Sequence, residues 1–456
     1  MARKHISRRQ ALRLLGTTGI TGLAGCTGGD SERADSGSGG SSSGTVSIGV
    51  LQPISGDLKY YGEQALWGFY SGLAYKGETD PIEKASTGTR SVTIGDTTYE
   101  LHVRDTQFDT DTAQTLATNL VQNEDVDLLF GCASSGAATR VIKTVSKQTG
   151  IPTLIGPAAS ASITADSETC AANVFRASEN TAMDARSGGT YVAQQTDVDS
   201  VYLFGADYSF GKAVVNNYRA VLEAEGIEIL GEKFVPQGYS EWEGLLKNAE
   251  DAGAAGIVGG FTVSTLPQLF TAFLNGDYSY RVFGGFATRI TNAAMGQTLQ
   301  KELGSLTKNA VKKTKLGPFT TRYHWNQYDN EINNEFVNMY TKTYGVVPDL
   351  FTAGTFTAAS AIVQAVEEAG STDGSDIGAA LGGMTVVDTP KGPDGYTFQG
   401  YNNQARSEMT VAAPVPTGDA WTDSWDAPVR PSDPVARIDA DTVTIPKGAD
   451  SMACTL

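Results

Sequence analysis

Short loops rich in glycine, alanine and serine follow three predicted strands in the N-terminal half of this 456-residue chain, at 55–61, 131–136 and 156–160. Small residues let a ligand approach the backbone, and hydroxyls and helix N-terminal amides donate hydrogen bonds to carboxylate or carbonyl oxygens. A single loop of this kind is equally well explained as ordinary loop composition. Three such loops on one rim predict a site for a small polar molecule.

Three further loops in the second half combine glycines with aromatic residues, at 205–211, 259–262 and 284–288. The aromatic residues include Tyr208, Phe210 and Phe261. Aromatic rings beside glycines can close over a ligand, although each ring taken singly is more often part of a hydrophobic core. These loops predict a second wall of the same site.

The elements that must position these loops are strands that alternate with helices. In the first half, strands are expected at 45–51, 101–104, 126–130 and 151–155, with helices of apolar periodicity between them. The acidic residues Asp109 and Asp111 are expected to cap a helix start. Alternation of strands and helices predicts a parallel sheet with right-handed crossovers.

The same alternation restarts after residue 200, with strands expected at 201–204, 227–235, 256–260 and 282–284. The predicted fold is therefore α/β, with two Rossmann-like doubly wound lobes, three hinge crossovers and a ligand cleft outside the carboxyl ends of the strands. The predicted first lobe is 45–178 with 318–382, the second is 179–317 with 383–420, and a C-terminal tail is 421–456. The chain is expected to return to the first lobe after Gly317, and 416–434 is expected to run along the surface.

The charge balance is strongly acidic, with 34 Lys and Arg against 51 Asp and Glu, a net charge of −17. Without the five basic residues that precede Cys26, 29 basic residues face 51 acidic ones, or −22. Such a balance disfavours nucleic acid or an anionic membrane surface as a partner. It resembles the balance in proteins of salt-loving archaea, whose acidic surfaces stay hydrated in strong salt.

The first 25 residues have the features of an export signal. Ser7-Arg8-Arg9-Gln10-Ala11-Leu12 is a twin-arginine pattern, and the weakly apolar stretch 14–24 that follows is far shorter than the ~20 residues of a membrane-spanning helix. The signal ends in Leu23-Ala24-Gly25-Cys26, which resembles a lipobox. This predicts cleavage before Cys26 and lipidation of its thiol, with the protein held on the extracellular face of the membrane.

A flexible tether is predicted to join this anchor to the folded part. Residues 26–44 are the lipidated Cys and a linker rich in glycine and serine that cannot bury apolar surface. The remaining cysteines are Cys132, Cys170 and Cys454, without a Cys-x-x-Cys pattern or a nearby histidine, so no metal site is expected. Export permits a disulfide, and Cys170 with Cys454 is the predicted pair because both lie in loop-like segments.

Short segments along most of the chain together carry a resemblance. They are Ile48-Gly49-Val50-Leu51, Ser55-Gly56, Tyr61-Gly62-Glu63, Ser134-Ser135-Gly136, Gly150-Ile151-Pro152, Pro157-Ala158-Ala159-Ser160, Asn173-Val174-Phe175-Arg176, Asp207-Tyr208-Ser209-Phe210-Gly211, Lys391-Gly392-Pro393, Phe398 and Asn403-Gln404-Ala405. In this order and spacing, Val46 to Pro414 resembles the type I periplasmic-binding-protein family, the leucine/isoleucine/valine- and amide-binding receptors of ABC importers.

The resemblance implies a set of ligand contacts. The serine that meets a ligand carboxylate falls at Ser135 or Ser134, and the small-residue stretch after the fourth strand falls at Ala158, Ala159 and Ser160. The remaining implied contacts are aromatic or lie after the last strand: Tyr61, Tyr208, Phe210, Phe261 and Ala287. Amino-acid receptors of the family place an acid near this last position, and no acid is there. An amide, a urea-like compound or a carboxylate is therefore as plausible a ligand as a branched-chain amino acid.

The resemblance implies an ABC importer's solute-binding component, with permease and ATPase subunits as partners, no cofactor and a monomeric state. An enzyme is the first alternative. Gly205 to Ala213 narrowly misses the phosphate-binding loop, and neither His102, in a strand, nor His324, expected at the surface, lies in a predicted cleft loop. No enzyme is therefore expected. The second alternative is a sensing receptor of the same fold that signals through a separate partner.

Overall fold

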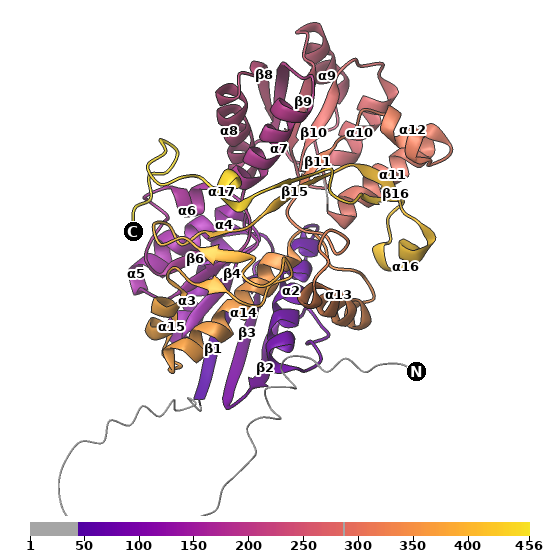
Figure 1. The fold of residues 1–456 in the computed structure, drawn as a ribbon. Helices are drawn as coiled ribbons and strands as arrows, with labels where there is room; N and C mark the ends of the chain where they lie inside the picture. The colour runs from indigo at the N-terminus through magenta and orange to yellow at the C-terminus, as the bar shows by residue number, and fades with distance from the viewer. Residues whose placement is uncertain (1–43, 286–287) are drawn as a thin grey trace, which may run out of the picture. The chain divides into compact units, whose positions relative to one another are not determined.

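The computed structural model describes residues 44–285 and 288–456 of the chain (Figure 1). The predicted export signal, Cys26, residues 27–43 of the linker and Ala287 lie outside these residues. Within them the strands form two larger sheets and three small ones.

The first lobe is built on a six-stranded sheet with the order β2-β3-β1-β4-β5-β6. Its strands are β1 (Gly44–Gln52), β2 (Gly88–Ile94), β3 (Thr97–Asp105), β4 (Leu128–Gly131), β5 (Thr153–Ile155) and β6 (Val174–Arg176). β2 pairs antiparallel with β3, and all other neighbours pair in parallel. Val50 and Leu51 of β1 belong to two different hydrophobic cores, because successive side chains of a strand point to opposite faces.

Helices cover both faces of this sheet. The first core includes α2 (Lys59–Gly77), α14 (Thr352–Ala369) and α15 (Gly374–Leu381), and α13 (Glu331–Tyr344) packs on α2. The second includes α3 (Thr110–Asn123), α4 (Ser135–Val141), η1 (Ile142–Ser146) and α6 (Ser162–Ala165), and η1 continues into α5 (Lys147–Thr149). Gly68 lets α2 approach α14, since a Cβ there would overlap Thr355. The predicted cap of α3 is confirmed at Asp109, which accepts a 2.7 Å hydrogen bond from Thr112 N.

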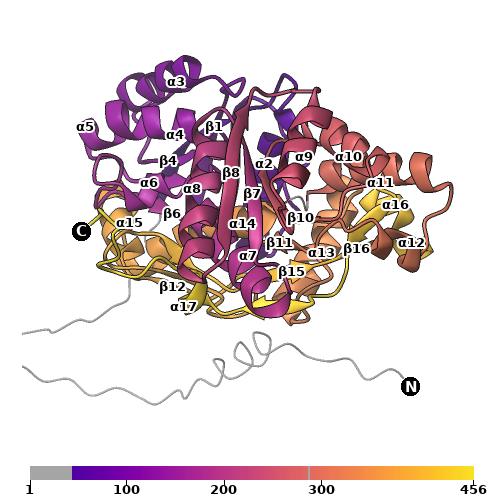
Figure 2. The same ribbon diagram turned by 90° about the horizontal axis from the view of Figure 1, so that it is seen from above.

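The second lobe repeats this architecture on a four-stranded parallel sheet with the order β10-β9-β7-β8. Its strands are β7 (Ser200–Ala206), β8 (Glu228–Val235), β9 (Gly256–Gly260) and β10 (Arg281–Gly284). One core contains α7 (Thr181–Gln195) and α8 (Ser209–Ala224), and the other contains α9 (Trp242–Asp251), α10 (Leu266–Asn275), α11 (Arg289–Leu303) and α12 (Lys308–Lys313). Figure 2 shows α8 and α9 on opposite sides of the sheet. The predicted α/β fold of two doubly wound lobes is confirmed.

Three chain segments cross between the lobes. The first joins Arg176 of β6 to α7, and the second runs from Phe319, in a core of the second lobe, to Tyr323, which packs in the first lobe. The third runs from Ala405, in the first lobe, to Met409. A three-stranded antiparallel sheet of β11 (Phe319–Thr321), β15 (Met409–Ala412) and β18 (Ala436–Ile438) forms at this hinge.

The hairpin region after residue 383 differs from its predicted assignment to the second lobe. β12 (Thr385–Val386), β13 (Tyr396–Phe398) and β14 (Ala405–Arg406) form a small sheet, and Val386, Tyr396 and Phe398 are buried in the first lobe's core. The prediction is wrong for this segment because its apolar side chains pack into the first lobe's core, which also contains Phe175 of the edge strand β6. β16 (Pro414–Pro416) is the first element after the hinge to contact α12 of the second lobe.

The predicted surface run at 416–434 is also wrong. This part of the tail contains η2 (Asp419–Trp421), α16 (Thr422–Trp425) and β17 (Val429–Pro431), and β17 pairs with β16. Trp425 and Val429 are fully buried. The indole of Trp425 packs on Trp325, with ring centroids 4.6 Å apart, so the tail completes a core instead of lying on the surface.

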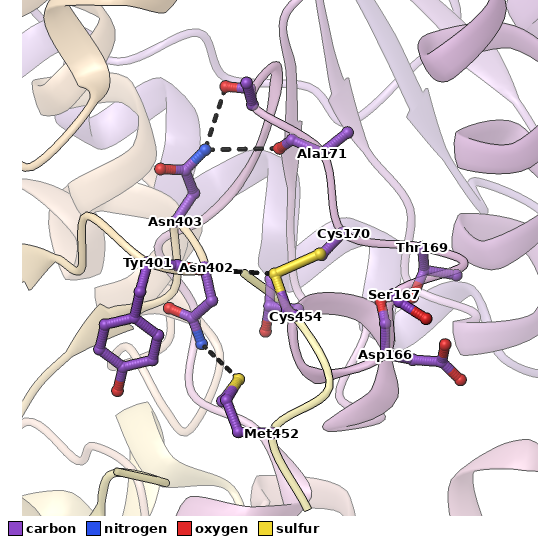
Figure 3. Close-up of a disulfide and its surroundings, with 12 residues drawn as sticks. Asp166, Ser167, Thr169, Cys170, Ala171, Tyr401, Asn402, Asn403, Met452 and Cys454 are labelled. Carbon is purple, nitrogen blue, oxygen red and sulfur yellow. Dashed lines mark hydrogen bonds between the residues drawn. A yellow bond between two sulfur atoms is a disulfide. The ribbon is translucent and has the colours of Figure 1, made fainter. Parts of the chain in front are cut away.

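The end of the chain returns to the first lobe. After β18, α17 (Ala440–Val443) packs on α7, and Cys454 forms a disulfide with Cys170, the pairing that the sequence predicts (Figure 3). The two Cα atoms are 5.9 Å apart, and Cys454 N donates to Ala165 O at 2.9 Å. Cys132 is buried and forms no disulfide with the other described cysteines. The tail thus makes a fourth connection between the lobes.

Candidate functional site

A cavity lies between the carboxyl ends of the two parallel sheets, where the ligand-cleft rule for such sheets places it. Its lining comes from loops that follow β1, β3, β4 and β5 in the first lobe, from loops that follow β7, β9 and β10 in the second, and from the hinge. About 90 Å³ is open to the centre of a water molecule, which is the scale of a small molecule. The cavity therefore has one wall from each lobe and a floor from the hinge.

The first wall consists of aromatic and small side chains. Its members are Tyr61, Phe108, Ala133, Ser135, Pro157, Ala159, Leu350 and Phe351. The Tyr61 ring meets the Phe351 ring edge-on at 5.5 Å between centroids. Burial raises the pKa of Tyr61 to about 12, so its hydroxyl stays protonated at neutral pH. The same hydroxyl accepts a 3.5 Å hydrogen bond from Val263 N of the second lobe, which joins the two walls.

The second wall combines rings with threonine hydroxyls. Its members are Tyr208, Phe210, Phe261, Thr262, Gly285, Thr288 and Thr291. The Tyr208 and Phe210 rings lie 6.0 Å apart, and Phe261 packs edge-on against the core residue Trp242 at 5.2 Å. Burial raises the pKa of Tyr208, so this phenol also stays neutral. This wall offers shape and neutral hydrogen-bonding groups, without a charge.

The floor, in contrast, is charged. Asp184 of α7, Thr320 of β11 and Arg322 line it. Arg322 donates to both carboxylate oxygens of Asp184, from Nε at 3.0 Å and from Nη2 at 2.5 Å. Burial lowers the pKa of Arg322, but the charge and hydrogen bonds of Asp184 outweigh burial and raise it. The floor thus holds a permanently charged guanidinium in a fixed orientation.

Ser135 is the first-wall hydroxyl best placed to meet a ligand. It begins α4, whose N-cap is Ser134, and its Oγ accepts a 3.1 Å hydrogen bond from Ser160 N. Because the oxygen already accepts that bond, the hydroxyl hydrogen can be donated to an acceptor in the cavity. Of the two serines left open by the sequence, Ser135 lines the cavity and Ser134 does not.

Six of the ten predicted contact residues line the cavity: Tyr61, Ser135, Ala159, Tyr208, Phe210 and Phe261. Ser134 instead accepts from Ala137 N, the Ala158 carbonyl accepts from Arg176, and Ser160 Oγ hydrogen-bonds Ser162 Oγ. These three stand behind the wall and shape it. Ala287, the tenth, is outside the described residues.

Sequence reasoning missed the floor and part of the first wall. Asp184 and Arg322 are separated by 138 positions, and nothing in the local sequence of either residue indicates that they meet. Phe351 directly precedes α14, a helix whose side chains belong to the first lobe's core. Phe108 lies between the strand predicted at 101–104 and the predicted helix cap at Asp109, and this position in a strand-exit loop is the signal that could have identified it.

Two further expectations concern other chemistry. In the part of the chain that the structure describes, no group of three or more His, Cys, Asp or Glu is arranged to hold a metal ion. His324 is fully buried, with its ring 5.6 Å from that of Trp425, so its predicted surface position is wrong. Over the same residues, no helix has the length and apolar character that crossing a membrane requires.

Two doubly wound lobes that close on one cavity, with crossings on one side, are the architecture of a bilobal binding protein. The family model described as "periplasmic binding protein" matches residues 45–419. The chain therefore belongs to the periplasmic binding protein family, a family of solute-binding proteins and not of enzymes, as the sequence predicts. A search of curated proteins found no match.

Solved structures share the fold at low identity. One is an amino acid ABC transporter substrate-binding protein from Pseudomonas fluorescens, with 19% identity, a TM-score of 0.72 and coverage of 90% of this chain and 99% of the other. A solute-binding protein of an ABC transporter from Rhodopseudomonas palustris, in complex with 3,4-dihydroxybenzoic acid, has 18% identity, a TM-score of 0.67 and coverage of 87% and 98%. A leucine-binding protein from Thermotoga maritima has 18% identity, a TM-score of 0.67 and coverage of 87% and 99%.

Proposed function

We propose that the protein is the extracytoplasmic solute-binding component of an ABC importer, which captures a small solute by closing its lobes. The observation that carries this proposal is the cavity, which residues of both lobes and of the hinge enclose together. A site built in this way is complete only when the lobes meet, so ligand binding favours the closed state. The permease then distinguishes a loaded protein from an empty one by its shape.

One contact supports closure as the capture step. The hydrogen bond from Val263 N to the Tyr61 hydroxyl joins the walls across the cavity, whereas the crossings lie on the floor side. Rotation about the crossings breaks this contact and opens the cavity without disturbing either sheet. The hydrogen bond from Arg289 N of the second lobe to Asp349 Oδ2 of the first, at 2.7 Å, is a further contact between the lobes that opening must break.

The solute that fits best has an apolar body. Six aromatic rings contribute to the walls: Tyr61, Phe108, Tyr208, Phe210, Phe261 and Phe351. Of the solutes that the sequence leaves open, a branched-chain amino acid or a carboxylate has more apolar surface to bury than urea. Two structural neighbours, the leucine-binding protein and the solute-binding protein in complex with 3,4-dihydroxybenzoic acid, are described with solutes of this kind.

We also propose that the chain is exported by the twin-arginine route and anchored by a lipid on Cys26. The signal pattern, the short apolar stretch and the cysteine follow one another in the order that this route needs. A protein anchored through a glycine- and serine-rich linker can reach a permease in the same membrane. In whole cells, Cys26→Ser should release the protein into the medium, and replacement of Arg8 and Arg9 by lysine should leave it unexported; unchanged fractionation of both variants would contradict this route.

Binding is tested by a thermal-shift screen in molar salt with amino acids, amides, urea and carboxylates. A solute at 100 times its Kd stabilises the protein by about 2.7 kcal/mol, which raises Tm by several degrees. The double variant Tyr61→Ala with Phe210→Ala, which strips one ring from each wall, should lose the shift. A solute that shifts the variant as much as the wild type binds elsewhere, and such a result, or the absence of any shift in the screen, would contradict the proposal.

The importer role is tested separately by uptake of the labelled solute into cells with and without the protein. Loss of the protein should abolish high-affinity uptake, and the wild-type chain should restore it. Binding in solution with unchanged uptake in the deletion strain would reject import and favour the sensing alternative.

A further inference from the structure

We propose that the cavity selects a solute with one negative charge, a monocarboxylate with an uncharged apolar body, and that Arg322 holds its carboxylate. This inference rests on the proposed function and names the chemical class of the solute. It stands on the hydrogen bonds of Arg322 and on the balance of charges buried around the cavity floor.

The first observation is an unused donor. Arg322 has three guanidinium nitrogens, and Asp184 accepts hydrogen bonds from Nε and Nη2. The third nitrogen, Nη1, is buried and has no hydrogen-bond partner among the described residues. Arg322 is only 4% exposed and lines the cavity, so bulk water does not readily supply the missing acceptor. Buried polar groups are almost always hydrogen-bonded, so an orphaned guanidinium nitrogen at a cavity indicates a missing acceptor. A carboxylate oxygen is the acceptor that a guanidinium binds most strongly.

The second observation is an excess of buried positive charge. Arg176 is fully buried, and its hydrogen bonds go to neutral acceptors: Gln404 Oε1, the Ala158 and Ser160 carbonyls and Thr164 Oγ1. Burial, and then the charge of Arg322, lower the pKa of Arg176 to about 9, which still leaves it charged at neutral pH. Its acceptors Ala158 and Ser160 flank Ala159, so this charge lies directly behind the cavity wall.

The neighbouring acids do not neutralise Arg176. Around the floor and the hinge, Asp184 is paired with Arg322 and Glu179 with Lys391, while Asp349 accepts hydrogen bonds from the Tyr60 hydroxyl and from the backbone N–H of Arg289. Asp426 also approaches Arg289, but its side chain is 80% exposed and therefore solvated. Among the described residues, Arg176 thus has neutral hydrogen-bond acceptors and no carboxylate in an ion pair with it. A buried charge is costly without a partner, and an anion in the cavity would supply one.

The same arrangement disfavours a zwitterion. The ammonium group of an α-amino acid needs an anionic acceptor in a buried site. Asp184 is the acid among the described lining residues, and its negative charge is already balanced by the ion pair with Arg322. An ammonium group would also meet the field of Arg176 and Arg322. A carboxylate without an amino group satisfies Nη1 and adds no further positive charge.

Titration calorimetry with matched probes tests this inference. The probes are 4-methylpentanoate, its amide 4-methylpentanamide and leucine, which share a branched body, together with benzoate and benzamide. At least one of the two carboxylates, 4-methylpentanoate or benzoate, should bind at least about tenfold more tightly than its own amide. If 4-methylpentanoate is the one that binds, it should also bind at least about tenfold more tightly than leucine. An amide or leucine that binds as tightly as the matched carboxylate would overturn the inference, as would failure of both carboxylates to bind.

The variant Arg322→Gln should weaken carboxylate binding by about tenfold or more and remove the preference over the amide, because the charge is lost and a neutral donor is kept. Arg437→Gln, in the hinge strand β18 and outside the cavity, is the matched control and should change neither. If Arg322→Gln does not fold, the double variant Asp184→Asn with Arg322→Gln removes both charges of the pair and makes the same prediction. A retained preference in a folded variant would overturn the role of Arg322.

These outcomes are distinguishable from failure of the proposed function. A neutral or zwitterionic solute that binds and is imported would leave the function standing and reject the anionic class. Absence of any binding in the wider screen would reject both.

Discussion

The walls of the cavity and its floor are built from different chemistry. The walls come from the strand ends of the two lobes and carry rings, hydroxyls and small residues, all uncharged. The floor carries Arg322 and Asp184 and adjoins the hinge. In the proposed closure mechanism, the walls separate as the lobes open, whereas the crossings, which are chain connections, stay together. The charged floor can therefore bind the charged group of a solute before the lobes close, and the rings of the walls then select its shape as the lobes close.

The floor continues into a buried network that joins all three crossings. Glu179 of the first crossing pairs with Lys391 at 2.7 Å and accepts from Ser407 of the third at 3.1 Å. The Tyr396 hydroxyl also donates to Glu179, at 2.5 Å. The charge of Glu179 also supports that of Arg322 on the second crossing. The hinge is therefore held by ionic and polar contacts as well as by chain connectivity.

The largest effect is expected from breaking this network. Glu179→Ala leaves the buried ammonium of Lys391 without its partner and should lower the free energy of unfolding by about 3–5 kcal/mol. Urea denaturation measures this loss. Lys59→Ala, in the exposed pair Lys59–Glu63, is the control and should cost about 0–1 kcal/mol. Equal losses in the two variants would mean that the hinge network contributes no more than a surface pair.

The tail disulfide should give the next largest effect. The tail packs on α7 on its way to the first lobe, where Arg186 Nε donates to Thr442 O at 2.6 Å, and Cys454 then closes a link of 284 positions to Cys170. Replacing both cysteines by alanine should lower the stability by about 2–5 kcal/mol. The wild type under reducing conditions should match this variant, and an unchanged urea midpoint in both would contradict a stabilising role for the link.

A ring removed from a wall should affect binding more than folding. Phe210 is only half-buried, so Phe210→Ala should keep the fold but lose about 1.5–3 kcal/mol of solute binding. Titration calorimetry measures the change in Kd. Phe234→Ala replaces a half-buried ring of the same lobe that lies outside the cavity lining, and it should leave Kd unchanged. Equal changes in the two variants would show that the walls do not make the contacts assigned to them.

A smaller effect is expected at the hydroxyl of the first wall. Ser135→Ala removes one neutral hydrogen bond and should weaken solute binding by about 0.5–1.5 kcal/mol, or at most roughly tenfold. Ser240→Ala, at an exposed position of the second lobe, serves as the control. Unaltered affinity in Ser135→Ala would remove this serine from the site and leave the floor as the main anchor.

The fall in stability at acid pH should include a contribution from Glu179 of the hinge network. Burial raises the pKa of Glu179, but Lys391, Tyr396 and Arg322 together outweigh burial and hold it below the ordinary value of 4.5. This contribution is fully present above pH 4.5 and is lost as the pH falls through the lowered pKa. Burial raises the pKa of Asp349, so that group changes stability in the opposite direction. The Glu179→Gln variant should therefore show a flatter fall in stability below pH 4.5 than the wild type, and parallel curves would contradict the pairing.

The walls could be predicted from the sequence, and the floor could not. Alternating strand and helix patterns place loops at the carboxyl ends of a parallel sheet, which is sufficient to bring Tyr61, Ser135 and Phe261 to one rim. Asp184 lies in a helix without a marked apolar stripe, and Arg322 lies in an irregular segment after β11. Their contact depends on how the second crossing passes α7, which is a tertiary property.

Lobe boundaries failed for a related reason. Residues 385–406 form short strands whose apolar side chains could complete either lobe, and only the packing of Val386, Tyr396 and Phe398 shows that they complete the first. The edge strand β2 alternates exposed Thr89, Ser91 and Thr93 with half-buried positions, of which Val92 and Ile94 are apolar, and this is a weak apolar signal. Trp425 occurs among acidic and glycine residues that are typical of a surface loop, yet it is buried by aromatic partners distant in sequence.

Small-angle scattering with a solute that calorimetry shows to bind tests the central claim most directly. The protein alone should populate open states, and saturation with solute should lower the radius of gyration as the lobes close on the cavity. Tyr61→Phe, which removes the hydroxyl that bonds Val263 N, should weaken this closure slightly. An unchanged radius of gyration at saturating solute would contradict capture by lobe closure.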